Sequence, residues 1–193
     1  MNACILHESS RGIDAFSPES SLLRKRILFF TEEVNPASSN QLIEYLLHLD
    51  MEAPGEEITL CINSPGGEVV SGLAVYDTIR MLKSPVRTVC IGTAASMGSI
   101  LFLAGEKREM LPHTKIMIHD PLITGISSSR RALELEKEAA QLMETRAVTA
   151  GIIAERCGKK LEEVYEKTKE DCYLTAQEAI DFGIATGIAE AIL

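Results

Sequence analysis

The chain has 193 residues, of which 46% are hydrophobic and 24% are charged, and its formal net charge is -9. This balance is typical of a folded globular protein, and the length fits one domain, so we expect a single domain over residues 1–193. The negative charge argues against a nucleic-acid partner, because such binding relies on basic patches that displace counterions.

The five cysteines are odd in number and widely spaced, and no two of them form a Cys-x-x-Cys pair. The sequence therefore predicts neither a disulfide framework nor a zinc site, and we expect reduced thiols in a cytoplasmic protein without metal or cofactor. The first residues lack the basic segment and long apolar core of a secretory signal. The longest apolar run, near 100–104, is too short to cross a bilayer, so we expect no membrane partner.

The first half of the chain alternates between predicted strands and helices. In chain order, these are a strand at 27–30, a helix at 40–50, a strand at 58–62, a helix at 69–82, a strand at 86–91 and a buried helix that ends at 103. Such alternation is typical of repeated βαβ units on a mainly parallel sheet. The predicted fold class is therefore α/β.

A turn with two glycines, Asn63-Ser64-Pro65-Gly66-Gly67, lies between the strand at 58–62 and the next helix. Glycine permits a positive φ and a close approach of another backbone. The Gly67 N–H, paired with the Met97 N–H, would offer two donors to an oxyanion, and losing one such donor typically costs about 2.7 to 4 kcal/mol of barrier. A tight βα turn without any catalytic role would have the same sequence.

Ser96 is the candidate nucleophile. It lies in the stretch 92–99, among glycine, alanine and other small residues, directly after the strand at 86–91. Small neighbours let the backbone turn sharply from strand to helix and leave the serine hydroxyl exposed. A serine becomes an effective nucleophile when a base deprotonates it and N–H groups await the oxyanion.

His119 is the candidate base, because the other three histidines lie in a polar tail, a helix and a turn. It ends a predicted strand at 116–119, and parallel α/β sheets bind their ligands at the carboxyl ends of strands. The alternative is a half-buried histidine at a strand end with no chemical role.

A third group, a carboxylate, should orient the imidazole. Asp171 is the candidate, because it follows a predicted helix at 161–169 and precedes a short apolar step that could tuck its carboxylate inward. From the local sequence alone, Asp77, Asp120 and Asp181 remain competitors.

A long helix is predicted over 130–156, with N-cap candidates at 127–129 and Gly158 just beyond its end. Apolar residues at three-to-four spacing indicate that one face of this helix is buried. They are Leu133, Ala140, Met143 and Ala147. The last helix opens with a capping box formed by Thr175 and Glu178 and ends at Gly183.

Four motifs together resemble the family of Clp protease proteolytic subunits, ClpP, over essentially the whole chain. They are the residues 62–67, the residues 92–99, Met117-Ile118-His119 with Pro121-Leu122, and Asp171 with Leu174-Thr175-Ala176. The resemblance implies a serine endopeptidase of the crotonase-like fold that cuts unfolded proteins into short peptides through an acyl-enzyme. It also implies the roles of nucleophile for Ser96, base for His119 and orienting acid for Asp171, and it puts Asp171 ahead of the other aspartates.

The same resemblance implies an assembly of two stacked heptameric rings that enclose the active sites. An AAA+ unfoldase of the ClpX, ClpA or ClpC kind would feed unfolded polypeptide into the chamber. In this chain, residues 1–21 would be the axial-loop segment, and residues from about 120 to 158 the handle region that interleaves between rings.

The chain departs from the family pattern at several positions. Thr59 and Cys61 stand where the family usually has tyrosines that help line the unfoldase pocket. Asp120 stands where the family usually has glutamine, and Lys169-Glu170 reverses the signs of a usual Asp-Arg pair. These departures motivate an alternative interpretation, in which the chain is a paralogous subunit that is mainly structural or regulatory and is active only in mixed rings. A hydratase or hydrolase that binds acyl-CoA on the same fold is a more distant alternative.

Overall fold

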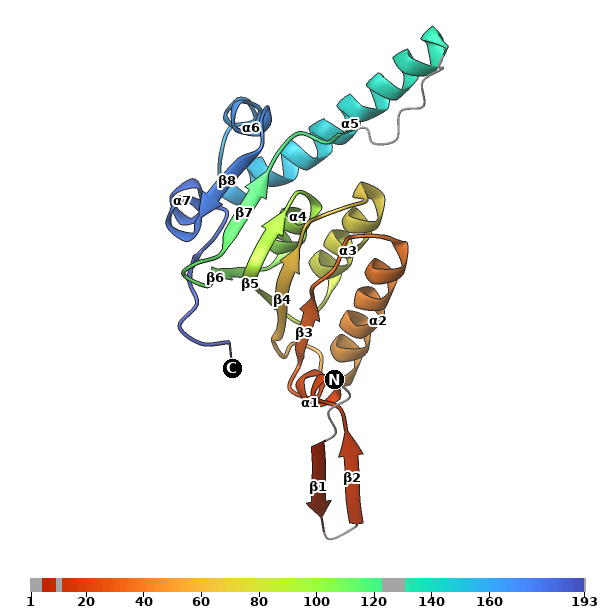
Figure 1. Cartoon of the computed structure of the whole chain (residues 1–193), viewed down its shortest axis with the longest axis vertical. Helices are drawn as coiled ribbons and strands as arrows, with labels where there is room; N and C mark the ends of the chain where they lie inside the picture. The colour runs from red at the N-terminus through yellow and green to blue at the C-terminus, as the bar shows by residue number, and fades with distance from the viewer. Residues whose placement is uncertain (1–4, 10–11, 123–130, 193) are drawn as a thin grey trace.

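The computed structural model describes residues 5–9, 12–122 and 131–192. Its centre is a seven-stranded sheet with the order β3-β4-β5-β6-β9, in which β7 pairs with β5 and β8 pairs with β7 (Figure 1). Among the described residues, every pairing in this sheet is parallel except that of β7 with β8. The strands are β3 (Ile27–Phe30), β4 (Ile58–Ser64), β5 (Val86–Ala95), β6 (Lys107–Met110), β7 (Lys115–Ile118), β8 (Cys172–Thr175) and β9 (Gly187–Ile188). The predicted α/β class with a mainly parallel sheet is confirmed.

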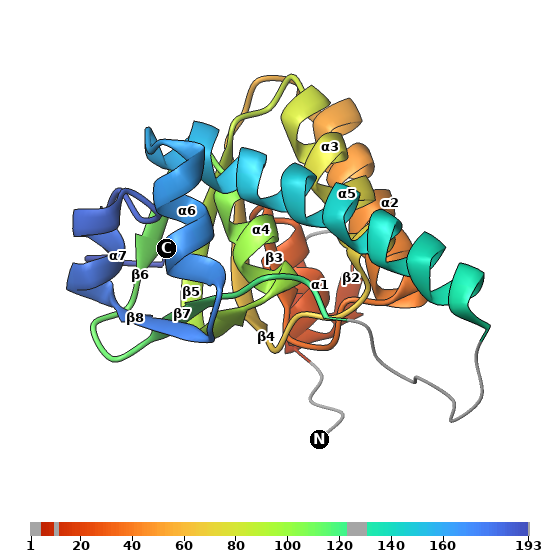
Figure 2. The same cartoon turned by 90° about the horizontal axis from the view of Figure 1, so that it is seen from above.

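Helices connect most of the strands. They are α1 (Pro18–Leu23), α2 (Pro36–Glu52), α3 (Val69–Met81), α4 (Met97–Ala104), α5 (Ala132–Cys157), α6 (Leu161–Thr168) and α7 (Ala176–Phe182). A two-stranded hairpin of β1 (Ile5–Ser9) and β2 (Gly12–Phe16) precedes α1. Figure 1 shows that the hairpin and the outer half of α5 project from opposite ends of the body, and Figure 2 shows α5 and α6 side by side on one end of the sheet.

Strand β4 separates the two faces of the sheet. Ile58, Leu60 and Ile62 are fully buried in the main core, together with apolar side chains of α2, α3 and α4. Thr59 and Cys61 alternate with them and lie on the opposite face, where both are also buried. The helices therefore cover one face of the sheet, and the other face carries a smaller apolar cluster.

Local capping residues account for the helix ends. Thr175 and Glu178 form the predicted capping box of α7, and Gly183 follows this helix with a φ of 94°. Helix α2 begins at Pro36, earlier than the predicted residue 40, because the Asn35 side chain accepts hydrogen bonds from the N–H groups at the helix start. The hairpin, α1, β6, β8 and β9 were not predicted.

The predicted burial of one face of the long helix is wrong for the single chain. Leu133 is 78% exposed and Met143 57% exposed, and Ala140 and Ala147 are exposed as well. The buried residues of α5 are Thr149, Ala150 and Ile153, all in its second half, where the helix meets the body. The N-cap candidates at 127–129 lie outside the described residues. Gly158 directly follows the helix, as predicted, and has the left-handed conformation.

A charged cluster ties the C-terminal segment to the sheet. Arg87 on β5 donates hydrogen bonds to the carbonyl oxygens of Ala191 and Ile192 and pairs with Glu109 on β6, which also pairs with Lys107. Burial would raise the pKa of Glu109, but the hydrogen bonds from Lys107 and Arg87 outweigh it and hold this pKa below its usual range.

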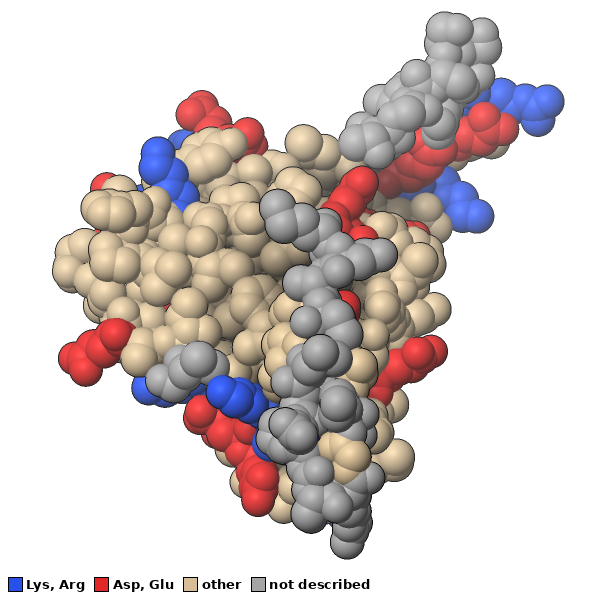
Figure 3. All heavy atoms as spheres, turned by 60° about the horizontal axis from the view of Figure 1, so that its bottom comes forward, with Lys and Arg blue, Asp and Glu red and all other residues tan. Residues whose placement is uncertain are grey.

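On the face of the molecule that Figure 3 shows, the charged side chains are dispersed. The face of the molecule in Figure 3 has broad uncharged areas, with acidic and basic side chains mixed at its edges and along α5. In the part of the chain that the structure describes, no helix has the length and apolar character needed to span a membrane.

Candidate active site

Ser96 lies at the junction of β5 and α4. Its φ of 52° and ψ of -123° are unusual for a residue other than glycine. The Ser96 N–H donates to the Met117 carbonyl at 2.9 Å, and the Ser96 carbonyl accepts from the Ser99 hydroxyl at 2.6 Å. These two hydrogen bonds hold the strained turn between strand and helix. Such a turn presents the serine side chain at the top of the sheet, as nucleophilic serines require.

The Gly66-Gly67 turn packs directly against the Ser96 turn. A Cβ added to Gly66 would lie 2.7 Å from the Ser96 Cβ and 2.6 Å from the Ala95 carbonyl oxygen, and the φ of Gly66 is 94°. Only glycine fits at this position without moving Ser96. On α4, a Cβ added to Gly98 would lie 3.0 Å from the Ser64 carbonyl oxygen, so the contact is close on both sides.

The two predicted oxyanion donors come from these neighbouring turns. The added Cβ of Gly66 would lie 2.9 Å from the Met97 nitrogen, so the Met97 N–H is beside the glycine turn. A bridge with Val34 holds Gly67: the Val34 N–H donates to the Gly66 carbonyl, and the Glu68 N–H donates to the Val34 carbonyl, each at 2.8 Å. These two bonds fix the peptide on each side of Gly67 and do not use the Gly67 N–H.

His119 and Asp171 complete a chain of hydrogen bonds to Ser96. The His119 Nε2 lies 2.8 Å from the Ser96 Oγ, and its Nδ1 lies 2.9 Å from the Asp171 Oδ1. His119 directly follows β7 and Asp171 directly precedes β8. The antiparallel pairing of Ile118 with Cys172 brings the two side chains together across 52 residues of sequence.

The environment of the Asp171 carboxylate differs from the expectation. Its side chain is 58% exposed, so the prediction that the following apolar step tucks the carboxylate inward is wrong for the single chain. The His119 side chain is much less exposed, at 14%. Asp120 instead binds Arg146 and Thr168, and Asp181 accepts from Gln177. Among the described residues, Asp171 is the aspartate that binds His119.

A small cavity adjoins Ser96 and His119. Its volume is about 30 Å³, and its other lining residues are Val69, Met97, Ser99, Ile100, Ile118, Pro121, Thr149 and Ile153. Most of these side chains are apolar, and the buried Thr149 hydroxyl donates to carbonyls of its own helix. The cavity is suited to a small apolar group next to the Ser96 hydroxyl.

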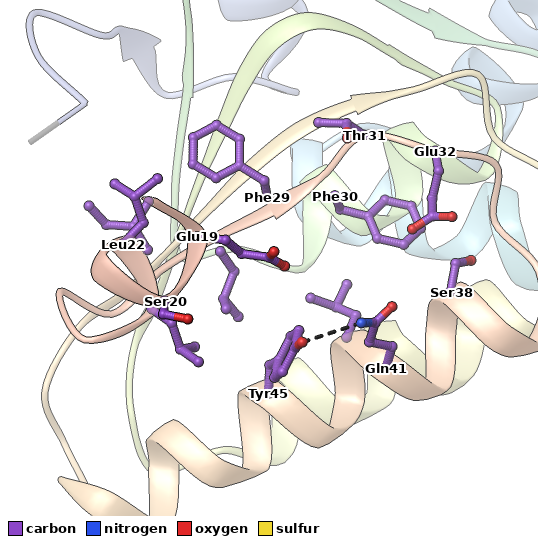
Figure 4. A pocket seen from close by; sticks show the side chains of 14 residues that line it. Glu19, Ser20, Leu22, Phe29, Phe30, Thr31, Glu32, Ser38, Gln41 and Tyr45 are labelled. Carbon is purple, nitrogen blue, oxygen red and sulfur yellow. Dashed lines mark hydrogen bonds between the residues drawn. The ribbon is translucent and has the colours of Figure 1, made fainter. Parts of the chain in front are cut away.

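A larger cavity of about 590 Å³ lies elsewhere, between α1, β3 and α2. Figure 4 shows Phe29, Phe30 and Tyr45 around it, with the Gln41 amide donating to the Tyr45 hydroxyl. Its described lining residues include neither Ser96 nor any histidine or cysteine, so it offers no nucleophile of the kind found at Ser96.

No group of three or more potential metal ligands occurs among the described residues. The cysteines at 61, 90, 157 and 172 are free thiols. Burial raises the pKa of Cys61 and of Cys157 to about 11, which makes both poor nucleophiles. The chemistry that the described side chains can support is therefore centred on the Ser96 hydroxyl.

Arg146 and Thr168, which bind the residue after His119, were not predicted from the sequence. No local pattern marks them, because both lie far from Asp120 in the sequence.

The chain matches the family model of Clp protease over residues 10–191. The matched range contains Ser96, His119, Asp171 and both glycines of the adjacent turn.

Proposed function

This chain belongs to the Clp protease family and is a ClpP-type serine peptidase, and we propose that Ser96, His119 and Asp171 are its catalytic residues. The observation that carries this proposal is the continuous hydrogen-bonded series from the Ser96 hydroxyl through the imidazole to the Asp171 carboxylate, at 2.8 and 2.9 Å. The strained φ of Ser96 supports it, because such strain persists where the surrounding structure maintains it and is common at active sites.

In the proposed reaction, the His119 Nε2 takes the proton of the Ser96 hydroxyl as the oxygen attacks the peptide carbonyl. Asp171 holds the proton on Nδ1 and stabilises the imidazolium. The N–H groups of Gly67 and Met97 stabilise the oxyanion. His119 then donates its proton to the leaving amine, which leaves an acyl-enzyme on Ser96. A water molecule that His119 deprotonates hydrolyses this ester and restores the free serine.

A fluorophosphonate probe tests these assignments, because it forms a covalent bond with an activated serine. We expect labelling at Ser96 and hydrolysis of short unstructured peptides, both lost in Ser96→Ala and in His119→Ala. His113→Ala is the matched control, since His113 is exposed and lies outside the site. Labelling at another serine, or equal labelling in His119→Ala, would contradict the proposal.

We further propose that the chain assembles into two stacked heptameric rings that receive unfolded polypeptide from an AAA+ unfoldase. Residues 1–21 would form the axial segment, and residues from about 120 to 158 the handle. Leu133 and Met143, both large, apolar and exposed on the projecting α5, support an interface there, because a partner that removes apolar surface from water stabilises the assembly. Native mass spectrometry would test this, with Met143→Lys expected to reduce the oligomer.

A subunit that is mainly structural or regulatory, and active only in mixed rings, is the second candidate. The observation that favours it is that Thr59 and Cys61 are buried and carry no aromatic ring, so these positions offer an unfoldase no exposed aromatic side chain. Peptidase activity that appears only when this chain is mixed with a paralogous subunit would distinguish it from a self-sufficient peptidase.

A further inference from the structure

Asp120, directly after His119, is the centre of a network that joins three elements. Its Oδ2 accepts from the Arg146 Nε of α5 at 2.6 Å, and its Oδ1 accepts from the Thr168 hydroxyl of α6 at 2.6 Å. Its N–H donates to the Thr168 carbonyl at 2.7 Å. The Arg146 guanidinium also stacks on the Tyr165 ring of α6, with 4.0 Å to the ring centroid. We call Asp120, Arg146 and Thr168 the Asp120 network.

The contacts of the network suit a carboxylate. Both partners of the side chain are donors, a hydroxyl and a guanidinium N–H, and each uses a different carboxylate oxygen. The side chains are sheltered, with 24% of Arg146 and 27% of Asp120 exposed. In asparagine, an NH2 donor would replace one of the two acceptor oxygens, so the Thr168 hydroxyl or the Arg146 guanidinium would lose its acceptor, and Arg146 would lose the negative charge opposite it.

The network is placed to determine the relative positions of His119 and Asp171. On one side of His119, Ile118 pairs with Cys172. On the other side, Asp120 binds Thr168 through both its backbone and its side chain. The segment 169–171, which ends in Asp171, is therefore attached at both ends to the two neighbours of His119. Loss of one attachment would free the Asp171 carboxylate to move relative to the imidazole.

We propose that Asp120, through Arg146 and Thr168, is a positioning residue that aligns Asp171 with His119. Asp120 does not touch the reacting atoms, and its effect is exerted through the His119–Asp171 hydrogen bond. This inference rests on the proposed function of Ser96, His119 and Asp171. It predicts a loss in kcat rather than in substrate binding, because the small cavity beside Ser96 does not include Asp120 among its lining residues.

The test compares Asp120→Asn with wild type in the intact assembled protein, using peptide hydrolysis and the rate of fluorophosphonate labelling at Ser96. We expect kcat and the labelling rate to fall about tenfold or more, and KM to change less than about twofold, since a 1 Å misplacement at an active site can cost roughly 100-fold. Asp181→Asn is the matched control, because it makes the same change at an exposed carboxylate of α7 that accepts from Gln177 and lies outside the network. Its kcat is expected to equal that of wild type.

A double-mutant cycle with Asp171→Asn separates positioning from general stability. If Asp120 acts through Asp171, Asp120→Asn causes no further loss of kcat in the Asp171→Asn protein. An equal loss in both backgrounds, or wild-type kcat in Asp120→Asn, overturns the inference. If Asp120→Asn does not fold or assemble, Thr168→Val takes its place, because it removes the side-chain bond and keeps the backbone bond to Asp120. An equal loss of kcat in both backgrounds, or wild-type kcat in Thr168→Val, then overturns the inference.

The proposed function can fail separately. A wild-type protein that neither hydrolyses peptides nor labels at Ser96, alone or in a mixed assembly, refutes the catalytic assignment and this inference with it. A wild-type protein that labels at Ser96, with Asp120→Asn equally active, refutes the positioning role alone.

Discussion

Replacing Gly66 by alanine is expected to damage both stability and activity, and two other glycines allow the causes to be separated. Gly66 has a φ of 94°, and its added Cβ would approach three atoms of residues 95–97 at 2.6 to 2.9 Å. Backbone strain of this kind costs about 1 to 3 kcal/mol, and overpacking adds about 1 to 3 kcal/mol, so we expect a loss of about 2 to 6 kcal/mol in the free energy of unfolding.

Gly55→Ala is the matched control for strain. Gly55 has almost the same φ, 90°, and its added Cβ would meet nothing within 4 Å, so only the strain cost of about 1 to 3 kcal/mol applies. Gly151→Ala, in the interior of α5 with no close atom, should stabilise the protein by about 1 kcal/mol because alanine favours the helix. Neither change should alter kcat.

The assay is denaturant unfolding together with kcat on a short peptide, at one protein concentration for all variants. We expect Gly66→Ala alone to lower kcat, by roughly 100-fold, because the crowded atoms are those that present Ser96 and the Met97 N–H. If Gly66→Ala and Gly55→Ala lose equal stability and both keep normal kcat, the close packing of the two turns has no catalytic consequence and the reasoning is refuted.

Three further results are expected. Ile153→Ala should enlarge the small cavity beside Ser96, at a cost of about 2 to 5 kcal/mol in the free energy of unfolding. The ratio of kcat/KM for a substrate with leucine on the amino side of the cleaved bond to that for one with alanine should rise about tenfold. An unchanged ratio would show that this cavity does not select the substrate. A subunit with the usual Asp-Arg pair should clash with the like charges of Lys169-Glu170 in wild type, and should co-assemble only with the double variant Lys169→Asp/Glu170→Arg. Native mass spectrometry would detect the mixed assemblies. Free mixing with wild type would contradict the clash. Because the folded-state pKa of Glu109 is depressed, its stabilising contribution is present above the unfolded pKa of about 4.3 and is lost as the pH falls through the folded pKa. In Glu109→Gln, the free energy of unfolding should therefore fall less steeply as the pH is lowered. An unchanged dependence of this free energy on pH would count against this role of Glu109.

The sequence alone determined those features that depend on neighbouring residues. The alternation of strands and helices indicated a mainly parallel sheet, and the small residues around Ser96 indicated a sharp turn. The capping box at Thr175 and the glycine at 183 marked the ends of α7. Such features are readable because turn geometry, helix capping and the period of apolar residues are set within a few residues of chain.

Contacts between residues that are far apart in the sequence became visible only in the tertiary structure. Local sequence left Asp171 among four aspartates and the resemblance favoured it, whereas only the register of β7 with β8 brings it to 2.9 Å from His119. The partners of Asp120 and the exposure of Met143 likewise became visible only in the fold. The physical reason is that a carboxylate or an apolar stripe has the same local sequence whether it is buried, paired or free, and the packing of elements far apart in the chain determines which of these it becomes.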